Sequence, residues 1–166
     1  YLIIYVPKFD YIQGRIFSFF NRETGSHNFQ SDKAIDSITS GGFFGKGIGE
    51  GTLKNRVPEA HTDYIISVIS EEFGVFTIML ILLLFLILIY MVFKKIRFEN
   101  DNMIKLILIG SISLILMQAT IHIGVNIRLF PTTGMTLPFL SYGGSSIVST
   151  SILAGIILNL TKRKIN

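Results

Sequence analysis

The sequence contains no cysteine, and its charged residues are scarce, at 16% of 166 positions. A chain without cysteine cannot form disulfides, bind metals through thiolates or attack a substrate with a thiol. The scarcity of charge is also uneven, since long stretches contain no Asp, Glu, Lys or Arg at all. The mean hydropathy of +0.55 is high for a soluble domain. The sequence therefore excludes thiol chemistry and indicates a membrane protein.

Three segments lack formal charge, namely residues 76–93, 106–127 and 144–160. A helix of about 20 apolar residues crosses a bilayer. We therefore predict an all-α, polytopic transmembrane helix bundle with three full spans, at 63–93, 106–127 and 144–160. The apolar start, residues 1–6, is predicted to be the end of a fourth span. Because the sequence has neither an initiator Met nor a charged signal peptide, we expect a C-terminal piece of a longer membrane protein.

Basic residues flank the spans at two places. Lys94, Lys95, Arg97 and Lys105 surround one short loop, and residues 162–164 close the chain. Short loops rich in Lys and Arg stay in the cytoplasm. Residues 94–105 and 161–166 are therefore predicted to be cytoplasmic. Residues 7–62 and 128–143 then form loops on the extracellular side of the plasma membrane.

A glycine-rich run occupies residues 41–51 of the first extracellular loop. It is not a Walker loop, because Gly47 rather than Ser or Thr follows Lys46. It is not a dinucleotide fingerprint either, because Glu50 stands at the position of the third glycine. Two readings remain, a flexible turn whose Phe43 and Phe44 dip into the membrane interface, or a lipid-pyrophosphate contact through backbone N–H groups.

Asp63 begins a predicted helix that runs from about Thr62 to Phe93. At 100° per residue, Ser67, Ser70 and Gly74 all lie within about 40° of Asp63, so that a polar stripe continues the carboxylate inward. Ionisable groups beside a span are costly, and they usually mark a functional site. Asp is also a common helix N-cap. Spacing alone leaves a catalytic role and a capping role open.

A second polar stripe lies in the next span, where Ser111, Gln118, His122 and Asn126 fall on one face. Such a stripe is expected to face the bundle interior, where polar groups find partners. For His122, hydrogen-bonded packing is the favoured role over proton handling.

The loop at 128–146 contains two of the four prolines and several glycines. Non-helical backbone at membrane depth occurs where it is buried in protein or lines a cavity, so we expect this re-entrant loop to approach Asp63. Ser141 lacks the Gly-x-Ser-x-Gly context of a serine nucleophile. A helix N-cap at Ser145 or Ser146 is predicted instead.

Several motifs resemble the SEDS (shape, elongation, division, sporulation) family of membrane proteins. They are Pro58-Glu59-Ala60-His61-Thr62-Asp63, the run Glu71-Glu72-Phe73-Gly74, and the segments 41–45, 118–126 and 131–146. The motifs occur in the family's order over nearly the whole chain. Ala60 before His61, and Thr136-Leu137-Pro138, resemble the division branch more than the elongation branch. Asp36 departs from the residue types usual in the family.

The resemblance implies a larger polytopic bundle that polymerises lipid II into peptidoglycan at the division septum. It implies that Asp63 is the family's essential aspartate. The implied partners are lipid II, a monofunctional class B penicillin-binding protein transpeptidase, other division proteins and the membrane, with no nucleic acid. The early spans of the family are missing from this sequence, so their cavity residues cannot be carried over.

Polymerisation joins a sugar hydroxyl to an anomeric carbon while undecaprenyl pyrophosphate leaves. Asp63 suits the general base, because desolvation beside a span would raise the pKa of its carboxyl toward working pH. The remaining predicted substrate-binding residues are Glu59, His61, Lys54, Arg56, Glu72, Arg128, Ser141, Gly143 and Gly144. The basic members would meet the pyrophosphate.

A divalent cation, Mg²⁺ or Mn²⁺, could be held by Glu59, His61 and Glu72, although their spacing does not demand a metal. No other cofactor is predicted. A lipid II flippase and a division scaffold are the alternative functions, because polar stripes and a re-entrant loop also suit a transporter.

Overall fold

The computed structural model describes residues 26–57 and 59–162. This part of the chain contains helices and no strand, which confirms the predicted all-α class. The helices are α2 (Ser26–Gly41), α3 (Leu53–Arg56), α4 (Ile65–Phe73), α5 (Val75–Phe98), α6 (Asn102–Asn126) and α7 (Gly144–Thr161). The predicted end of a span at residues 1–6 lies outside the described residues.

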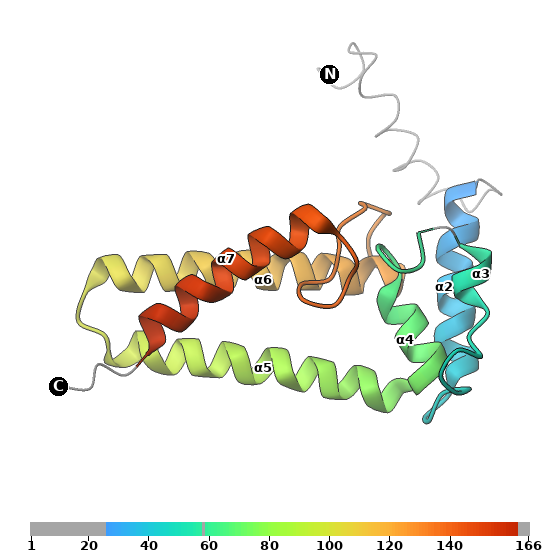
Figure 1. Ribbon diagram of the computed structural model, residues 1–166, viewed down its shortest axis with the longest axis horizontal. Coiled ribbons are helices and arrows are strands. Elements are labelled where there is room, and N and C mark those ends of the chain that lie inside the picture. Colours follow the sequence, from blue (N-terminus) through green and yellow to red (C-terminus); the bar gives the residue numbers. More distant parts are fainter. Residues whose placement is uncertain (1–25, 58, 163–166) are drawn as a thin grey trace, which may run out of the picture.

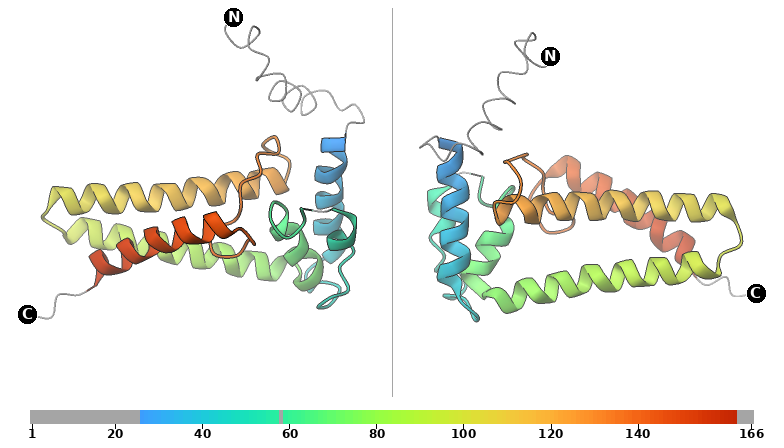
Figure 2. Two further views of the ribbon diagram at one scale, coloured as in Figure 1. Left: turned by 45° about the horizontal axis from the view of Figure 1, so that its top comes forward. Right: turned by 180° about the vertical axis from the view of Figure 1, so that it is seen from behind.

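Helices α5, α6 and α7 are each long and apolar enough to cross a membrane, which confirms the three predicted full spans. Their inward side chains form a core that includes Val92, Leu108, Ile112, Ile115 and Ile157. Most of the remaining apolar surface of α5 faces outward, as a lipid environment allows. Figure 1 shows α5 and α6 as a long antiparallel pair, and Figure 2 shows α7 crossing them obliquely.

The C-terminal ends of α5 and α7 and the N-terminal end of α6 gather at one end of this bundle (Figure 1). The basic residues Lys94, Lys95, Arg97 and Lys105 lie there. The carboxylate of Asp101 caps α6 by accepting a bond from the N–H of Met103 at 2.8 Å. The segment that contains Asp63 lies at the opposite end, as expected from the charge pattern.

Helix α2 runs across that opposite end of the bundle and packs mainly against α4 (Figure 1). Together with α3 and α6, these helices enclose a small core that includes Ala34, Leu53, Tyr64, Val68 and Val125. The predicted extracellular loop therefore contains a folded layer that rests on the ends of the spans.

The helix expected to run unbroken from Thr62 to Phe93 is interrupted at Gly74, so that prediction is wrong. Gly74 has φ 84° and ψ 173°, which ends α4 and starts α5. A break of this kind leaves carbonyls of the first helix and N–H groups of the second without helical partners. One side of the break carries only acceptors and the other only donors. A third segment must therefore supply N–H donors to the first side and carbonyl acceptors to the second.

The glycine-rich run supplies these partners. The N–H groups of Lys46 and Gly47 donate to the carbonyls of Glu71 and Glu72 at 2.9 and 3.1 Å. In return, the carbonyls of Gly42 and Phe43 accept from the first N–H groups of α5, at 3.0 and 3.4 Å. The run is therefore pinned rather than flexible.

This pinning also bears on the two readings of the glycine-rich run. The N–H groups of Gly45, Lys46, Gly47 and Glu50 all donate to protein carbonyls, so they are not available to a pyrophosphate. Phe43 and Phe44 are 72% and 89% exposed beside the start of α5. The structure thus favours a turn with protruding aromatic rings.

Glycine is required where the run meets the break, because the two backbones touch. A Cβ on Gly41 would collide with the carbonyl of Ser70, one on Gly45 with that of Glu72, and one on Gly74 with that of Phe43. Gly45 and Gly74 also have positive φ, which side chains disfavour.

We expect Gly74→Ala to lower the free energy of unfolding by about 2 kcal/mol or more, because the methyl collides with Phe43 and the left-handed backbone is strained. Thermal unfolding of the purified protein in detergent measures the change. The matched control is Gly110→Ala, since a Cβ there meets open space within α6. This control should unfold at or above the wild-type temperature. An unchanged unfolding temperature for Gly74→Ala would contradict the role of the break.

Candidate functional site

Asp63 lies in a tight turn that precedes α4. The N–H groups of Thr62 and Asp63 both donate to the carbonyl of Glu59, at 3.2 and 3.0 Å. Tyr64 occupies the N-cap position of α4, and its own side chain makes no cap hydrogen bond. The alternative prediction of Asp63 as the N-cap is therefore wrong. Tyr64 is buried in the core, which fixes the half-buried Asp63 beside it.

The backbone of Asp63 is held by α6. The carboxamide nitrogen of Asn126 donates to the carbonyl of Asp63 at 3.0 Å, and its oxygen accepts from the hydroxyl of Ser67 at 2.7 Å. Asn126 and Ser67 are completely buried. The polar stripes predicted on α4 and α6 therefore meet each other in the interior, as expected for the α6 stripe.

The loop at 128–143 lies against the same turn, which confirms the expected approach. The hydroxyl of Ser141 donates to the carbonyl of Thr62 at 2.8 Å, and the N–H of Tyr142 donates to the carbonyl of His61 at 3.2 Å. Gly134 lies next to the carboxylate, because a Cβ built on it would be 3.6 Å from Oδ2 of Asp63. Asp63 is thus enclosed by backbone from a second loop.

Ser141 is buried, and its hydroxyl is occupied on both sides. It donates to Thr62 and accepts from the N–H of Leu137 at 2.8 Å. These bonds identify Ser141 as the residue that ties the loop to the Asp63 turn. His122 supports the same loop, since its Nδ1 lies 2.7 Å from the carbonyl of Met135.

Helix α7 begins at Gly144, with Gly143 in extended conformation at the N-cap. The predicted N-cap at Ser145 or Ser146 is therefore wrong. The hydroxyl of Ser146 instead accepts a bond from Gln118 of α6 at 3.0 Å. That bond draws Ser146 toward α6 rather than toward the free N–H groups of its own helix.

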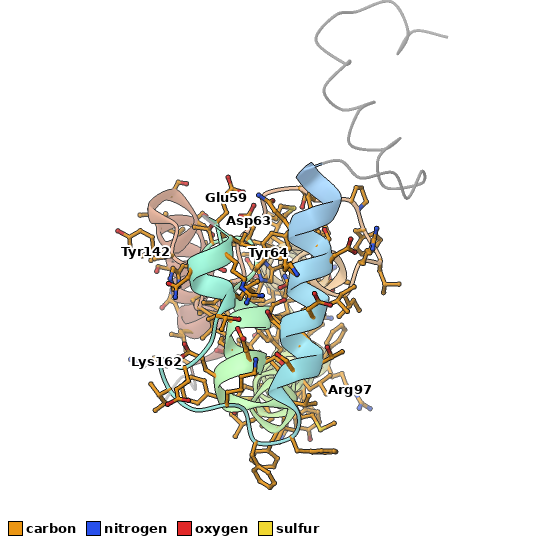
Figure 3. All side chains as sticks on the ribbon, turned by 90° about the vertical axis from the view of Figure 1, so that its right-hand side faces the viewer. Glu59, Asp63, Tyr64, Arg97, Tyr142 and Lys162 are labelled. Atoms are coloured by element: carbon orange, nitrogen blue, oxygen red, sulfur yellow. The ribbon has the colours of Figure 1, made fainter. Side chains whose placement is uncertain are left out.

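The other predicted site residues are dispersed. Glu59 and His61 are exposed on the Asp63 turn, and Figure 3 looks onto this end of the molecule. Arg56 is exposed at the end of α3, the helix that also contains Lys54. Glu72 lies about two helical turns from the start of α4. It faces the glycine-rich run, so it is not beside Asp63.

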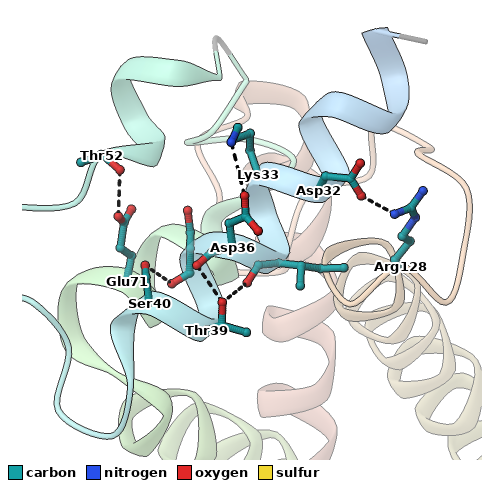
Figure 4. A network of polar contacts seen from close by, with 10 residues as sticks. Asp32, Lys33, Asp36, Thr39, Ser40, Thr52, Glu71 and Arg128 are labelled. Carbon is teal, nitrogen blue, oxygen red and sulfur yellow. Dashed lines mark hydrogen bonds and ion pairs between the residues drawn. The ribbon is translucent and has the colours of Figure 1, made fainter. Parts of the chain in front are cut away.

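Arg128 forms an ion pair with Asp32 of α2 (Figure 4). Arg128 has a φ of 59°, an uncommon conformation for a residue with a side chain. The pair joins α2 to the start of the loop at 128–143. Nothing in the sequence pattern connects the two residues, which are 96 positions apart.

Glu71 is the most buried carboxylate in the described part of the chain, with its side chain 1% exposed. It accepts bonds from Nζ of Lys46 at 3.0 Å, the hydroxyl of Thr52 at 3.1 Å and the N–H of Leu53 at 3.0 Å. Burial opposes ionisation, but these donors prevail and lower the pKa of Glu71 to about 2. Glu71 is therefore an ionised anchor that ties α3 and the glycine-rich run to α4.

The described residues contain no preformed ligand set for a divalent ion. Within residues 26–57 and 59–162, no three His, Asp or Glu side chains converge as metal ligands would. Glu59, His61 and Glu72 in particular do not gather, because Glu72 lies at the far end of α4. The three residues named for a cation therefore do not form one ligand set in the described part of the chain.

Residues 1–166 match the cell cycle protein family of FtsW, RodA and SpoVE. The chain belongs to this family. It is 38% identical over 157 residues to the probable peptidoglycan glycosyltransferase FtsW of Caulobacter vibrioides, an alignment that covers 94% of the chain. It is also 38% identical over 135 residues to the stage V sporulation protein E of Bacillus subtilis, with 81% of the chain covered.

The fold of this FtsW/RodA/SpoVE chain resembles a solved structure described as "Structural coordination of polymerization and crosslinking by a peptidoglycan synthase complex". The TM-score is 0.72 at 25% identity, and 95% of this chain is covered. The chain spans less than half the length of its relatives, with 40% of the Caulobacter protein, 37% of the Bacillus protein and 44% of the solved chain matched.

In this FtsW/RodA/SpoVE chain, we expect Glu71→Gln to speed hydrogen exchange at the amide of Leu53 and to destabilise the α3 segment by about 2 kcal/mol, because a charged acceptor is lost. Hydrogen-exchange mass spectrometry measures both effects. Glu50→Gln, an exposed change in the same run, should leave this amide protected. Equal exchange in both variants would contradict the anchoring role.

The stabilisation that Glu71 provides depends on pH. The pKa of Glu71 falls from 4.5 to about 2 on folding, so its contribution to stability is complete above pH 4.5 and is lost as the pH falls toward 2. The shift corresponds to about 3 kcal/mol. Glu71→Gln should remove this part of the acid sensitivity in unfolding measurements between pH 5 and 2.

Proposed function

We propose that the chain provides the catalytic end of a membrane glycosyltransferase that polymerises lipid II into peptidoglycan, with Asp63 as the general base. The observation that carries this proposal is the position of Asp63. Asp63 is half-buried at the end of the bundle away from the basic cluster. Its turn is held by the side chains of Asn126 and Ser141, and Gly134 of the loop at 128–143 lies next to its carboxylate. The names of the relatives as peptidoglycan glycosyltransferases support the same reaction.

In the reaction, a sugar hydroxyl of the acceptor attacks the anomeric carbon of the donor. Its proton passes to the carboxylate of Asp63 while the bond to undecaprenyl pyrophosphate breaks. A positioned general base contributes roughly 10²- to 10⁴-fold to such a step. Asn126 and Ser141 would contribute indirectly, because they hold the Asp63 turn in place before the substrate arrives.

The departing pyrophosphate needs positive charge, and we assign Arg56, Arg128 and Lys54 to this role. Arg128 is already oriented by Asp32, so it would meet the anion with little loss of side-chain freedom. Glu59 and His61, exposed on the turn, would contact the sugars or peptide of the substrate. Gly143 and Gly144 would let the substrate approach the start of α7.

We further propose a transpeptidase partner, a class B penicillin-binding protein, together with other proteins of the division septum. The solved relative belongs to a peptidoglycan synthase complex, which supports a partner of this kind. The three spans place the chain in a membrane. By the charge rule, the Asp63 end lies outside the cytoplasm, where the lipid-linked substrate has already crossed.

We expect Asp63→Asn in the full-length protein to lower polymerisation by at least about 100-fold, because the carboxamide cannot accept the proton. Glycan chains made from purified lipid II, with the transpeptidase partner present, are measured by gel. The control is Asp36→Asn, an exposed carboxylate on α2 whose loss should leave the rate within about twofold. Normal polymer from a folded Asp63→Asn protein would refute the assignment.

The same variant separates the alternative functions. A flippase needs no general base, so Asp63→Asn should leave lipid II translocation in vesicles unchanged if transport is the function. A scaffold would support polymerisation only by another enzyme. Polymer made by the purified protein and its partner, without any other polymerase and from lipid II supplied on the outer side, would exclude both alternatives as the full account.

A further inference from the structure

A polar cavity of about 330 Å³ lies between α6, the loop at 128–143 and the start of α7. Its lining includes Gln118, Thr136, Ser145, Ser146 and Ser149, with no charged side chain in the described lining. The volume is at the lower end of the range of roughly 300–1,000 Å³ seen for small-molecule sites. Of the residues assigned to substrate contact above, only Gly143 lines this cavity.

The orientation of Gln118 follows from its bonds. Its carboxamide nitrogen lies 2.9 Å from the backbone carbonyl of Thr136, 3.2 Å from the hydroxyl of Thr136 and 3.0 Å from that of Ser146. A backbone carbonyl can only accept, so the nitrogen of the amide must be the atom that faces it. The carboxamide oxygen has no donor among the described residues. It is therefore the atom of Gln118 that is left to accept a bond from a ligand.

Ser146 offers the complementary group. Its hydroxyl oxygen accepts from Gln118 and also from the hydroxyl of Thr136, at 3.0 and 2.5 Å. With both lone pairs used, its own hydrogen is left to donate. The cavity therefore presents an acceptor and a donor side by side.

This pairing selects a class of ligand. Sugar hydroxyls and acetamido groups both donate and accept hydrogen bonds, so they satisfy the oxygen of Gln118 and the hydroxyl of Ser146 together. The pyrophosphate diester of a lipid-linked sugar offers only acceptors at neutral pH, and it would meet the oxygen of Gln118 without compensation from Lys or Arg in the lining. The lining thus favours a neutral saccharide over a phosphate.

The cavity shares a wall with the proposed base. Gly134 belongs to the lining, and the same residue lies against Oδ2 of Asp63, where a Cβ would be 3.6 Å from the carboxylate. Asp63 does not itself line the cavity, but a sugar ring there would lie beside the glycine that borders the carboxylate. The group that must lose a proton in the reaction is the hydroxyl of the acceptor.

We propose that this cavity binds the N-acetylhexosamine of the glycosyl acceptor, with Gln118 and Ser146 as its binding residues. The sugar presents one hydroxyl to Asp63, which takes the proton as the new glycosidic bond forms and the donor's pyrophosphate leaves. This inference rests on the proposed function, because the acceptor is defined by that reaction. Binding and polymerisation are therefore tested separately.

Binding of a soluble disaccharide of N-acetylglucosamine and N-acetylmuramic acid to the full-length protein is measured by saturation-transfer NMR. We expect Asp63→Asn to bind as the wild type does. Ser146→Ala, which leaves the bonds between Gln118 and Thr136 intact, should weaken binding about fivefold through the loss of one hydrogen bond. Gln118→Met should weaken it at least tenfold. Ser113→Ala, an exposed hydroxyl elsewhere on α6, is the matched control and should bind as the wild type does.

Equal affinity for the disaccharide in all folded variants would overturn the proposal. The proposal would also fail if inorganic pyrophosphate competed with the disaccharide and Ser146→Ala relieved that competition. Thermal unfolding identifies any variant that fails to fold. If Gln118→Met does not fold, the comparison of Ser146→Ala with Ser113→Ala decides the outcome. In polymerisation assays Ser146→Ala should raise KM for lipid II about fivefold with kcat within twofold. If Asp63→Asn polymerises normally while the binding pattern holds, the assignment of the base fails and the saccharide site stands.

Discussion

The reciprocal hydrogen bonding at Gly74 is the constraint on which the outer end of this structure depends. A helix broken beside a membrane exposes carbonyls on one side and N–H groups on the other, and each is costly without a partner. One short run, residues 42–47, satisfies both sides. Because the bonds require backbone to touch backbone, they also require glycine at Gly41, Gly45 and Gly74. The layer formed by α2, α3 and α4 is attached to the spans through this junction.

Helix α4 connects the junction at Gly74 to the candidate site. Its C-terminal end is fixed by the glycine-rich run and by Glu71, and its N-terminal end by Asn126 and Ser67. Asp63 directly precedes that second end. A rigid helix of nine residues therefore connects the fixed junction to the proposed base. The loop at 128–143 then closes over the turn through Ser141, so that the carboxylate is positioned by three separate parts of the chain.

Features that depend on short, contiguous stretches of the sequence were predictable from the sequence. The three spans follow from uncharged runs, and the inward stripe on α6 follows from its period, since Gln118, His122 and Asn126 all bond to other elements. The break at Gly74 was missed because its cause is a segment some 30 positions away, while a lone glycine is tolerated within a helix. The pairs of Glu71 with Lys46 and of Arg128 with Asp32 depend on tertiary contacts for the same reason. Asp63 was selected by resemblance, and the structure then removed its competing role as a cap.

The break at Gly74 also has an electrostatic consequence. A helix carries a partial negative charge at its C-terminus and a partial positive charge at its N-terminus. At Gly74 the C-terminus of α4 meets the N-terminus of α5, so their partial charges largely cancel at this point beside the membrane. The N-terminus of α4 meets the last residue of α6, Asn126, whose carboxamide bonds to Ser67 and to the carbonyl of Asp63. A helix C-terminus therefore faces a helix N-terminus at both ends of α4, and the turn that holds Asp63 lies between opposite partial charges.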